Sequence, residues 1–186
     1  NTKDLLNEYE KTFLKLKVVN IDENVNHVIG KKFALTLGIK SAKYENLLLT
    51  DADCYVESNK WISSMASNFN KYDVVLGYGA YQKEKGLLNK FIRFDTYIIA
   101  MQYFSYALKS LTYMGVGRNL AYKKSIFFKN KGFANHLHVS SGDDDLFIRE
   151  VSKKYKVGIE LSEKSHTISI PKRKWKDWYA QKRRHL

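Results

Sequence analysis

Short apolar runs alternate with longer amphipathic segments along this chain. The runs at residues 46–50 and 73–81 read N-L-L-L-T and D-V-V-L-G-Y-G-A-Y, which is typical of strands buried in a sheet. Residues 2–14, 30–42 and 58–69 carry apolar side chains at helical spacing. This alternation predicts an α/β fold in which helices flank a mixed, mostly parallel sheet.

Two later regions extend the pattern. Residues 87–113 are dense in apolar and aromatic side chains, which predicts a long helix that faces the core. The alternative for this stretch is a helix that lies at a membrane interface. The runs at 157–161 and 166–170 predict two short strands that can pair as a hairpin.

The size and charge of the chain limit its class. Its 186 residues suit one domain with a hydrophobic core, so we expect a single domain over residues 1–186. Lys and Arg number 32 against 19 Asp and Glu, and the net charge of +13 predicts an anionic partner such as phosphate groups, nucleic acid or an acidic membrane surface. The single cysteine, Cys54, excludes a disulfide framework and favours a reducing compartment.

Two acids, Asp51 and Asp53, follow the strand expected at residues 46–50. Side chains at the carboxyl end of such a strand face the crevice in which α/β proteins bind ligands. In an extended chain the spacing of two residues places both carboxylates on one side, and oxygen ligands of this kind select Mg²⁺ or Mn²⁺. The alternative is a pair of ordinary solvated loop acids.

Three consecutive acids, Asp143, Asp144 and Asp145, precede a helix that begins near Leu146. Capping that helix and matching its dipole requires only one of them. Three acids exceed that need, so one of them, kept partly buried, can act as a general base toward a hydroxyl group.

The C-terminal segment, residues 171–186, is basic and aromatic. Its lysines and arginines outnumber its one acid, Asp177, and they interleave with Trp175, Trp178 and Tyr179. This pattern indicates phosphate binding or attraction to a membrane surface, although single-stranded nucleic acid fits it as well. A purely solvated helix end is the alternative.

Taken in order, these motifs resemble glycosyltransferase family 2, the inverting nucleotide-sugar enzymes of the GT-A fold. The matching family patterns are G-K-x-x-A-L, the D-x-D strand end, G-x-G-x-N-x-A-x-R-R followed by G-G-F, G-E-D-x-x-L and Q-x-x-R-W. They fall on residues 30–35, 47–53, 115–124 with 132–133, 142–146 and 181–185. The chain departs from them at Asp143, where the family has Glu, and at His185, where it has Trp.

The resemblance implies a Rossmann-like GT-A fold. It also implies that the chain is a fragment that lacks the N-terminal nucleotide-binding strand, so that residues 1–186 form a partial catalytic domain. The expected activity is metal-dependent, inverting transfer of a sugar, of the hexosyltransferase type, from a nucleotide-sugar donor to an acceptor hydroxyl. The expected acceptor is a saccharide or a lipid-linked molecule.

The resemblance also assigns roles to residues. Asp53 and Asp51 would hold Mg²⁺ or Mn²⁺, and Asp144 would be the catalytic base. The implied substrate-binding residues are Asp51, Lys31, Gly117, Arg118, Asn119, Asp143, Gln181 and Arg184.

The wider setting follows from the same resemblance and from composition. We expect a bacterial enzyme of cell-surface polysaccharide or glycolipid synthesis, in the cytoplasm or on the cytoplasmic side of the inner membrane at an anionic surface, without a nucleic-acid partner. The alternatives are a nucleic-acid-binding or metal-dependent nuclease domain, and a non-catalytic scaffold that keeps the transferase fold.

Overall fold

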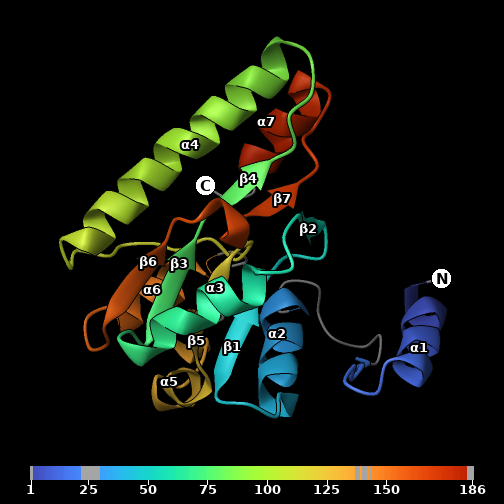
Figure 1. Ribbon diagram of the computed structural model, residues 1–186, viewed down its shortest axis with the longest axis vertical. Coiled ribbons are helices and arrows are strands. Elements are labelled where there is room, and N and C mark those ends of the chain that lie inside the picture. Colours follow the sequence, from blue (N-terminus) through green and yellow to red (C-terminus); the bar gives the residue numbers. More distant parts are fainter. Residues whose placement is uncertain (1, 22–29, 137–138, 140–141, 143, 184–186) are drawn as a thin grey trace. The chain divides into compact units, whose positions relative to one another are not determined.

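The computed structural model describes residues 2–21, 30–136, 139, 142 and 144–183. They divide into two compact units, Asn1–Lys43 and Tyr44–Leu186. The first unit contains the helices α1 (Thr2–Thr12) and α2 (Gly30–Ser41), both at positions that the apolar spacing predicts (Figure 1).

The second unit contains a four-stranded sheet with the order β1-β5-β3-β6. Strand β5 runs antiparallel to both β1 and β3, whereas β3 and β6 are parallel. The four strands are β1 (Asn46–Leu49), β3 (Val74–Gly77), β5 (Leu120–Lys123) and β6 (Val157–Glu160).

A smaller sheet lies beside it, with the order β2-β7-β4. Here β2 and β7 are antiparallel, and β4 and β7 are parallel. Its strands are β2 (Cys54–Val56), β4 (Gly79–Tyr81) and β7 (Thr167–Ser169). The hairpin expected for residues 157–161 and 166–170 is wrong, because β6 and β7 belong to different sheets.

The predicted α/β class with a mixed sheet and flanking helices is confirmed. The prediction that most strand pairs are parallel is wrong, because antiparallel pairs predominate. Strand β5 is antiparallel to two neighbours because the chain re-enters the sheet at the end where β3 leaves it, after a helix and residues 109–119. A buried apolar run reads the same in both directions, so the sequence pattern carries no information on strand direction.

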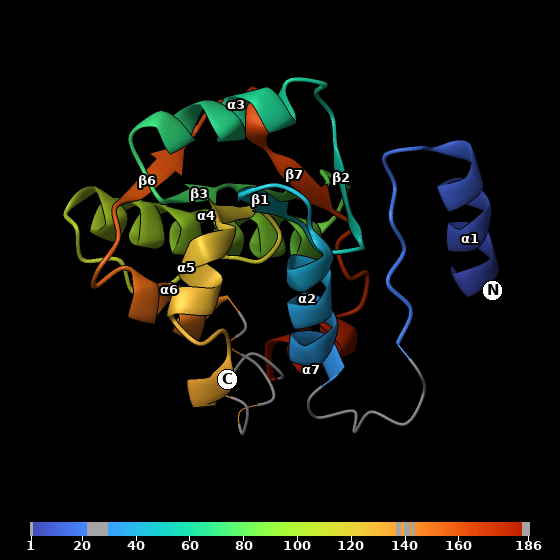
Figure 2. The same cartoon turned by 90° about the horizontal axis from the view of Figure 1, so that it is seen from below.

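Helices cover both faces of the larger sheet (Figure 2). On one face α3 (Trp61–Ser67) packs Met65 against Val75 and Ala121. On the other, α5 (Lys124–Lys129) and α6 (Asp145–Val151) enclose an aromatic cluster in which the rings of Tyr122 and Phe147 lie 5.0 Å apart. The described residues also include three short 3₁₀ turns, at Asn68–Asn70, Ala134–His136 and Glu163–Ser165.

Helix α4 (Leu87–Leu108) is the longest described helix and carries α7 (Trp175–Arg183) on its first turns. The Phe91 ring contacts Trp175 and Trp178, with centroids 5.6 and 5.2 Å apart. One face of α4 is buried in the core, as expected, and holds Ile92 and Tyr103. Among the helices of the described residues, none combines the length and apolarity needed to cross a bilayer.

The register of the larger sheet sets the position of the site. Leu120 at the start of β5 stands opposite Leu49 and Leu76, which lie at or next to the ends of β1 and β3. The segments that follow β1 and β3, and the segment that precedes β5, therefore meet at one edge of the sheet.

Candidate active site

The segment 115–119 is fixed at this sheet edge by two threonine hydroxyls. Thr50, directly after β1, donates from Oγ1 to the carbonyl oxygen of Arg118 at 2.9 Å. Thr167, the first residue of β7, donates to the same carbonyl at 2.9 Å. The segment is thereby held between the two sheets, next to the turn that carries Asp51 and Asp53.

Asp144 joins the same segment from the other side. Its Oδ2 accepts a hydrogen bond from the Gly117 amide at 2.7 Å, and its Oδ1 accepts from the Asp145 amide at 2.9 Å as the N-cap of α6. A Cβ atom at Gly117 would lie 3.2 Å from Oδ2, which explains why glycine serves at this close approach. The two amides fix the orientation of the carboxylate.

Asn119 organises the interior beneath the segment. Its side chain is fully buried, and its Nδ2 donates to the carbonyls of Tyr78 and Ser165 at 3.0 and 2.7 Å. Its Oδ1 accepts from Trp61 Nε1 at 3.1 Å. Because the amide is engaged by protein groups on every side, we assign Asn119 a positioning role in place of the substrate contact that the resemblance implied.

Arg118 directs its side chain toward the smaller sheet. Its guanidinium carbon lies 4.7 Å from the centre of the Tyr81 ring. Within the described part of the chain, its buried Nη1 atom has no hydrogen-bond partner. This arrangement is chemically suited to an anion, because an arginine N–H that lacks a protein acceptor can donate to a ligand oxygen.

Asp51 and Asp53 lie in a turn rather than in an extended strand. The Cys54 amide donates to the Asp51 carbonyl at 3.1 Å and closes this turn, after which β2 begins. The prediction that an extended chain places both carboxylates on one side is therefore wrong, because the backbone turns between them. Asp51 is half-buried and Asp53 is exposed.

The donor set of this turn consists of carboxylate oxygens. Within the described ranges, no group of three or more His, Cys, Asp and Glu side chains is placed to hold a metal ion. Mg²⁺ in nucleotide enzymes is commonly bound through one or two carboxylates together with substrate phosphates and waters. Asp51 and Asp53 fit that mode, in which the substrate completes the coordination.

The family model described as Glycosyl transferase family 2 matches residues 1–154. The chain belongs to this family.

The fold of this family 2 chain is similar to that of a solved enzyme described as mannosyltransferase PcManGT from Pyrobaculum calidifontis, in complex with GDP-Man and Mn2+. The TM-score is 0.68 at 18% sequence identity, and the match covers 97% of this chain but 48% of that one. The GT-A fold implied by the resemblance is thus confirmed. The chain spans about half the length of that structure, and no curated protein sequence matches it.

The remaining residues that the family pattern singled out are dispersed. Lys31 lies on α2 in the other unit, so its role stays a prediction. Gln181 lies on α7, whose described ring and ion-pair contacts are with α4. Asp143 and Arg184 lie outside the described residues.

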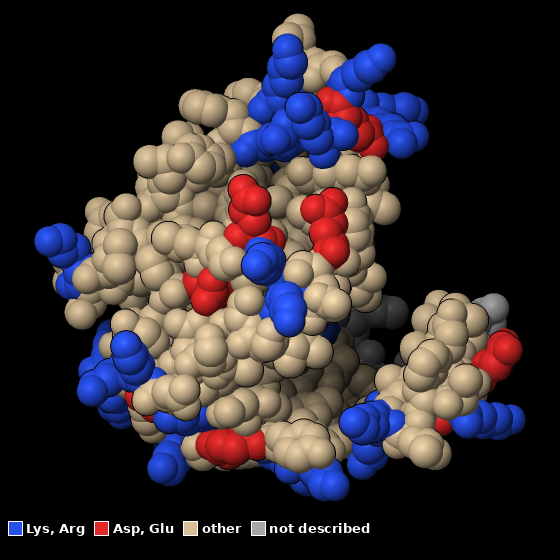
Figure 3. Space-filling model, in the orientation of Figure 1, with Lys and Arg blue, Asp and Glu red and all other residues tan. Residues whose placement is uncertain are grey.

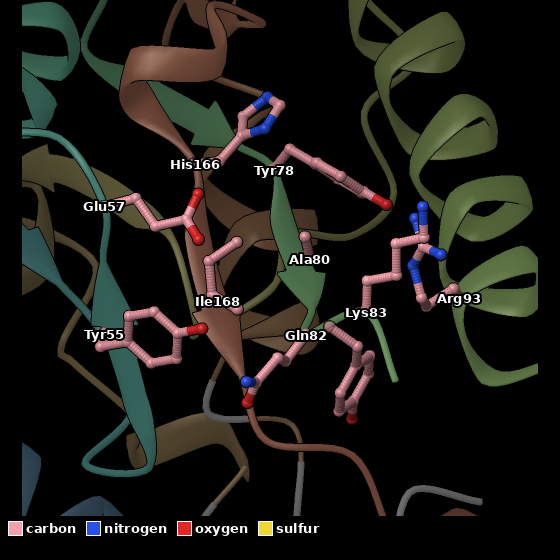
Figure 4. A pocket seen from close by; sticks show the side chains of 10 residues that line it. Tyr55, Glu57, Tyr78, Ala80, Gln82, Lys83, Arg93, His166 and Ile168 are labelled. Carbon is pink, nitrogen blue, oxygen red and sulfur yellow. The ribbon is translucent and has the colours of Figure 1, made fainter. Parts of the chain in front are cut away.

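A cavity of about 300 Å³ beside the site escaped sequence reasoning (Figure 4). It is lined by alternate residues of the smaller sheet, among them Tyr78, Ala80 and Gln82, and by Arg93 of α4. The sequence predicted a strand for residues 73–81, in which alternate side chains share a face, but nothing there indicated that α4 would supply the opposite wall.

Proposed function

We propose that this family 2 chain is the catalytic portion of a glycosyltransferase that uses a nucleotide-sugar donor. The observation that carries the proposal is the double attachment of segment 115–119, to Thr50 beside the Asp51–Asp53 turn and to Asp144. Membership of the family and the fold shared with a mannosyltransferase support it. Two sets of acids, more than 90 residues apart in the sequence, thereby border one segment.

In the proposed reaction Asp144 is the general base. It accepts the proton of the acceptor hydroxyl while that oxygen forms a bond to the anomeric carbon of the donor. The bond from this carbon to the diphosphate oxygen breaks, and the nucleoside diphosphate leaves. Because attack and departure occur on opposite faces of the sugar, the anomeric configuration is inverted.

Asp51 and Asp53 would hold a divalent cation, Mg²⁺ or Mn²⁺. Such a cation neutralises negative charge on a leaving diphosphate. The Gly117 amide keeps the Asp144 carboxylate oriented, and the Arg118 guanidinium offers an N–H donor to an anionic group of the substrate.

The decisive experiment compares Asp144→Asn with Asp145→Asn in the full-length protein. Asparagine also caps helices, so α6 is preserved in the first variant. We expect Asp144→Asn to lower sugar transfer by about 10²-fold or more while donor binding persists, because general-base catalysis contributes on that order. Retained turnover in Asp144→Asn together with loss in Asp145→Asn would move the role of base to Asp145.

The donor class is testable by thermal stability. A ligand that binds the folded state alone must raise its stability. We expect the full-length protein with Mn²⁺ to be stabilised by one member of a panel of UDP-, GDP- and dTDP-sugars, and this stabilisation to be lost in an Asp51→Asn/Asp53→Asn variant. Equal stabilisation of that variant would exclude the metal role of the two acids.

We further propose that the protein works at an anionic membrane surface. Figure 3 shows Lys and Arg gathered where α7 and the start of α4 lie, whereas the flank along α4 is nearly free of charge. On that helix Phe94 and Tyr97 are 62% and 54% exposed. An apolar aromatic face bordered by basic residues is the pattern of interfacial helices. A role in cell-surface polysaccharide or glycolipid synthesis on the cytoplasmic side of a bacterial membrane follows as an expectation.

A further inference from the structure

The cavity beside the active site is built on one face of the smaller sheet. Tyr55, Ile168 and Ala80 form one row across its three strands, because Ile168 pairs in register with both of the others. Side chains two residues away along each strand continue the same face (Figure 4). These are Glu57, His166 and Tyr78.

Two basic side chains border this cavity and have no counter-ion among the described residues. In the described part of the chain, neither Lys83 nor Arg93 makes a hydrogen bond or an ion pair through its side chain. The neighbouring acid, Glu84, is instead paired with Arg173 at 3.2 Å. The two positive charges thus face a recess that holds one acid, Glu57.

The Tyr78 side chain lies close to positive charge at the edge of the recess. Figure 4 shows its hydroxyl directed toward the Arg93 side of the cavity. Burial raises the pKa of this phenol, and the positive charges of Arg118 and Arg93 oppose the rise. Both guanidinium groups therefore act on the space that the hydroxyl enters.

Tyr78 also joins the cavity to the active site. Its carbonyl accepts from Asn119 Nδ2 at 3.0 Å, while its ring lines the cavity and meets the His166 ring edge-on at 5.0 Å. Arg118 stacks on Tyr81, another residue of the lining. Tyr78 therefore links the cavity to segment 115–119, whose Gly117 amide holds the Asp144 carboxylate.

We propose that this cavity binds the acceptor through a phosphate group, held by Lys83 and Arg93. The inference rests on the proposed function and names the class of its second substrate. In that function a metal ion held by Asp51 and Asp53 would neutralise the diphosphate of the donor, so Lys83 and Arg93 remain available for the acceptor. Lysine and arginine are the usual partners of phosphate oxygens, and the aromatic lining suits the organic part of such a molecule.

The test is a calorimetric titration of the full-length protein with glycerol 3-phosphate, without donor and without metal. We expect Arg93→Gln and Lys83→Gln each to weaken binding roughly tenfold, since a charge-assisted hydrogen bond is worth about that factor. Lys129→Gln, an exposed lysine on α5, removes the same charge and should leave the affinity unchanged. Thermal unfolding of each variant checks that the fold is kept.

A second arm distinguishes a soluble from a lipid-linked phosphate. Phosphatidylcholine vesicles that contain phosphatidic acid are compared with vesicles of phosphatidylcholine alone. Binding that depends on phosphatidic acid and on Arg93 supports a lipid-linked acceptor, and Arg93-dependent binding of glycerol 3-phosphate alone supports a soluble one. Absence of binding to both probes, or equal affinities in the Arg93, Lys83 and Lys129 variants, overturns the inference. Donor binding with Mn²⁺, measured separately, tells this failure from a failure of the proposed function.

Discussion

Single residues at the sheet edge act mainly by holding backbone segments in place. Asn119 is the clearest case, since one buried amide joins β5, Tyr78 and the turn at Ser165. Position 77 requires glycine beside it, because a Cβ atom there would lie 2.5 Å from the Asn119 amide carbon. The positions of Arg118 and Gly117 therefore depend on a residue that does not reach the surface.

Replacement of Asn119 by alanine should lower the free energy of unfolding by about 3 kcal/mol, because three buried groups lose their partner at about 1 kcal/mol each. Chemical denaturation measures the loss. Asn130→Ala is the matched control, since Asn130 donates to the partly exposed Glu150 at 2.9 Å. Equal losses in the two variants would contradict the central position of Asn119.

Asp73 should make stability depend on acid. Burial alone would raise its pKa. Hydrogen bonds from Lys123 Nζ at 2.7 Å and from the Lys156 amide, together with the positive charges of both lysine side chains, lower the pKa below its ordinary value of 3.8. A lowered folded-state pKa adds stability above pH 3.8 that is lost as the pH falls through the folded value. Asp73→Asn should therefore unfold more easily at neutral pH, with a difference that shrinks in acid.

Thermal midpoints across a pH series measure this difference for Asp73→Asn. The exposed Asp177 supplies the control Asp177→Asn, for which we expect little change at any pH. A deficit of Asp73→Asn that stays constant down to strongly acid pH would show that the ionised carboxylate is not its source.

At the scale of elements, α4 has two apolar faces. One face is buried, and the other carries Phe94, Tyr97 and Met101 in the open. Helix α7 covers only the beginning of this outer face, through Trp175 and Trp178 on Phe91 and an ion pair from Lys182 to Asp95. The two alternatives weighed for residues 87–113, a core helix and an interfacial helix, are thus compatible with one helix.

The outer face of α4 should determine membrane affinity. Phe94→Ser/Met101→Ser is expected to weaken binding to anionic vesicles at least tenfold, because each apolar side chain withdrawn from water contributes about 1.5–3 kcal/mol. Vesicle co-sedimentation measures the effect, and Ile62→Ser on the outer side of α3 is the control. Undiminished binding of the double variant would assign the membrane contact to another surface.

At the scale of the whole molecule, the excess of positive charge dominates. A net charge of +13 favours any anionic surface, and such attraction is screened within about 10 Å at 0.1 M salt. Charge alone is therefore insufficient for specificity, which we assign to the acids proposed for the active site and to the proposed acceptor cavity.

Binding to anionic vesicles should consequently fall as salt rises, with a residual part that salt does not remove. The residual part reflects the apolar face of α4, so it should vanish in Phe94→Ser/Met101→Ser. Titration of vesicle binding against sodium chloride separates the two contributions. Complete loss of wild-type binding in high salt would show that charge acts without apolar insertion.

The positions of most strands and helices follow from the sequence because burial leaves a local pattern. The apolar run at 46–50 became β1, and the spacing at 58–69 became α3. The family also followed from motifs whose order is local information, and the same motifs carry the prediction that Asp51, Asp53 and Asp144 act at the site.

Tertiary structure alone decided how these pieces meet. The direction of β5, the separation of β6 from β7 and the turn at Asp51 depend on where the chain re-enters each sheet, which no local pattern records. The buried role of Asn119 and the union of Arg93 with Tyr78 in one cavity depend on contacts between residues distant in sequence. Side-chain type limits the chemistry that a residue can perform, but only its neighbours in space determine whether it binds a substrate or supports the chain.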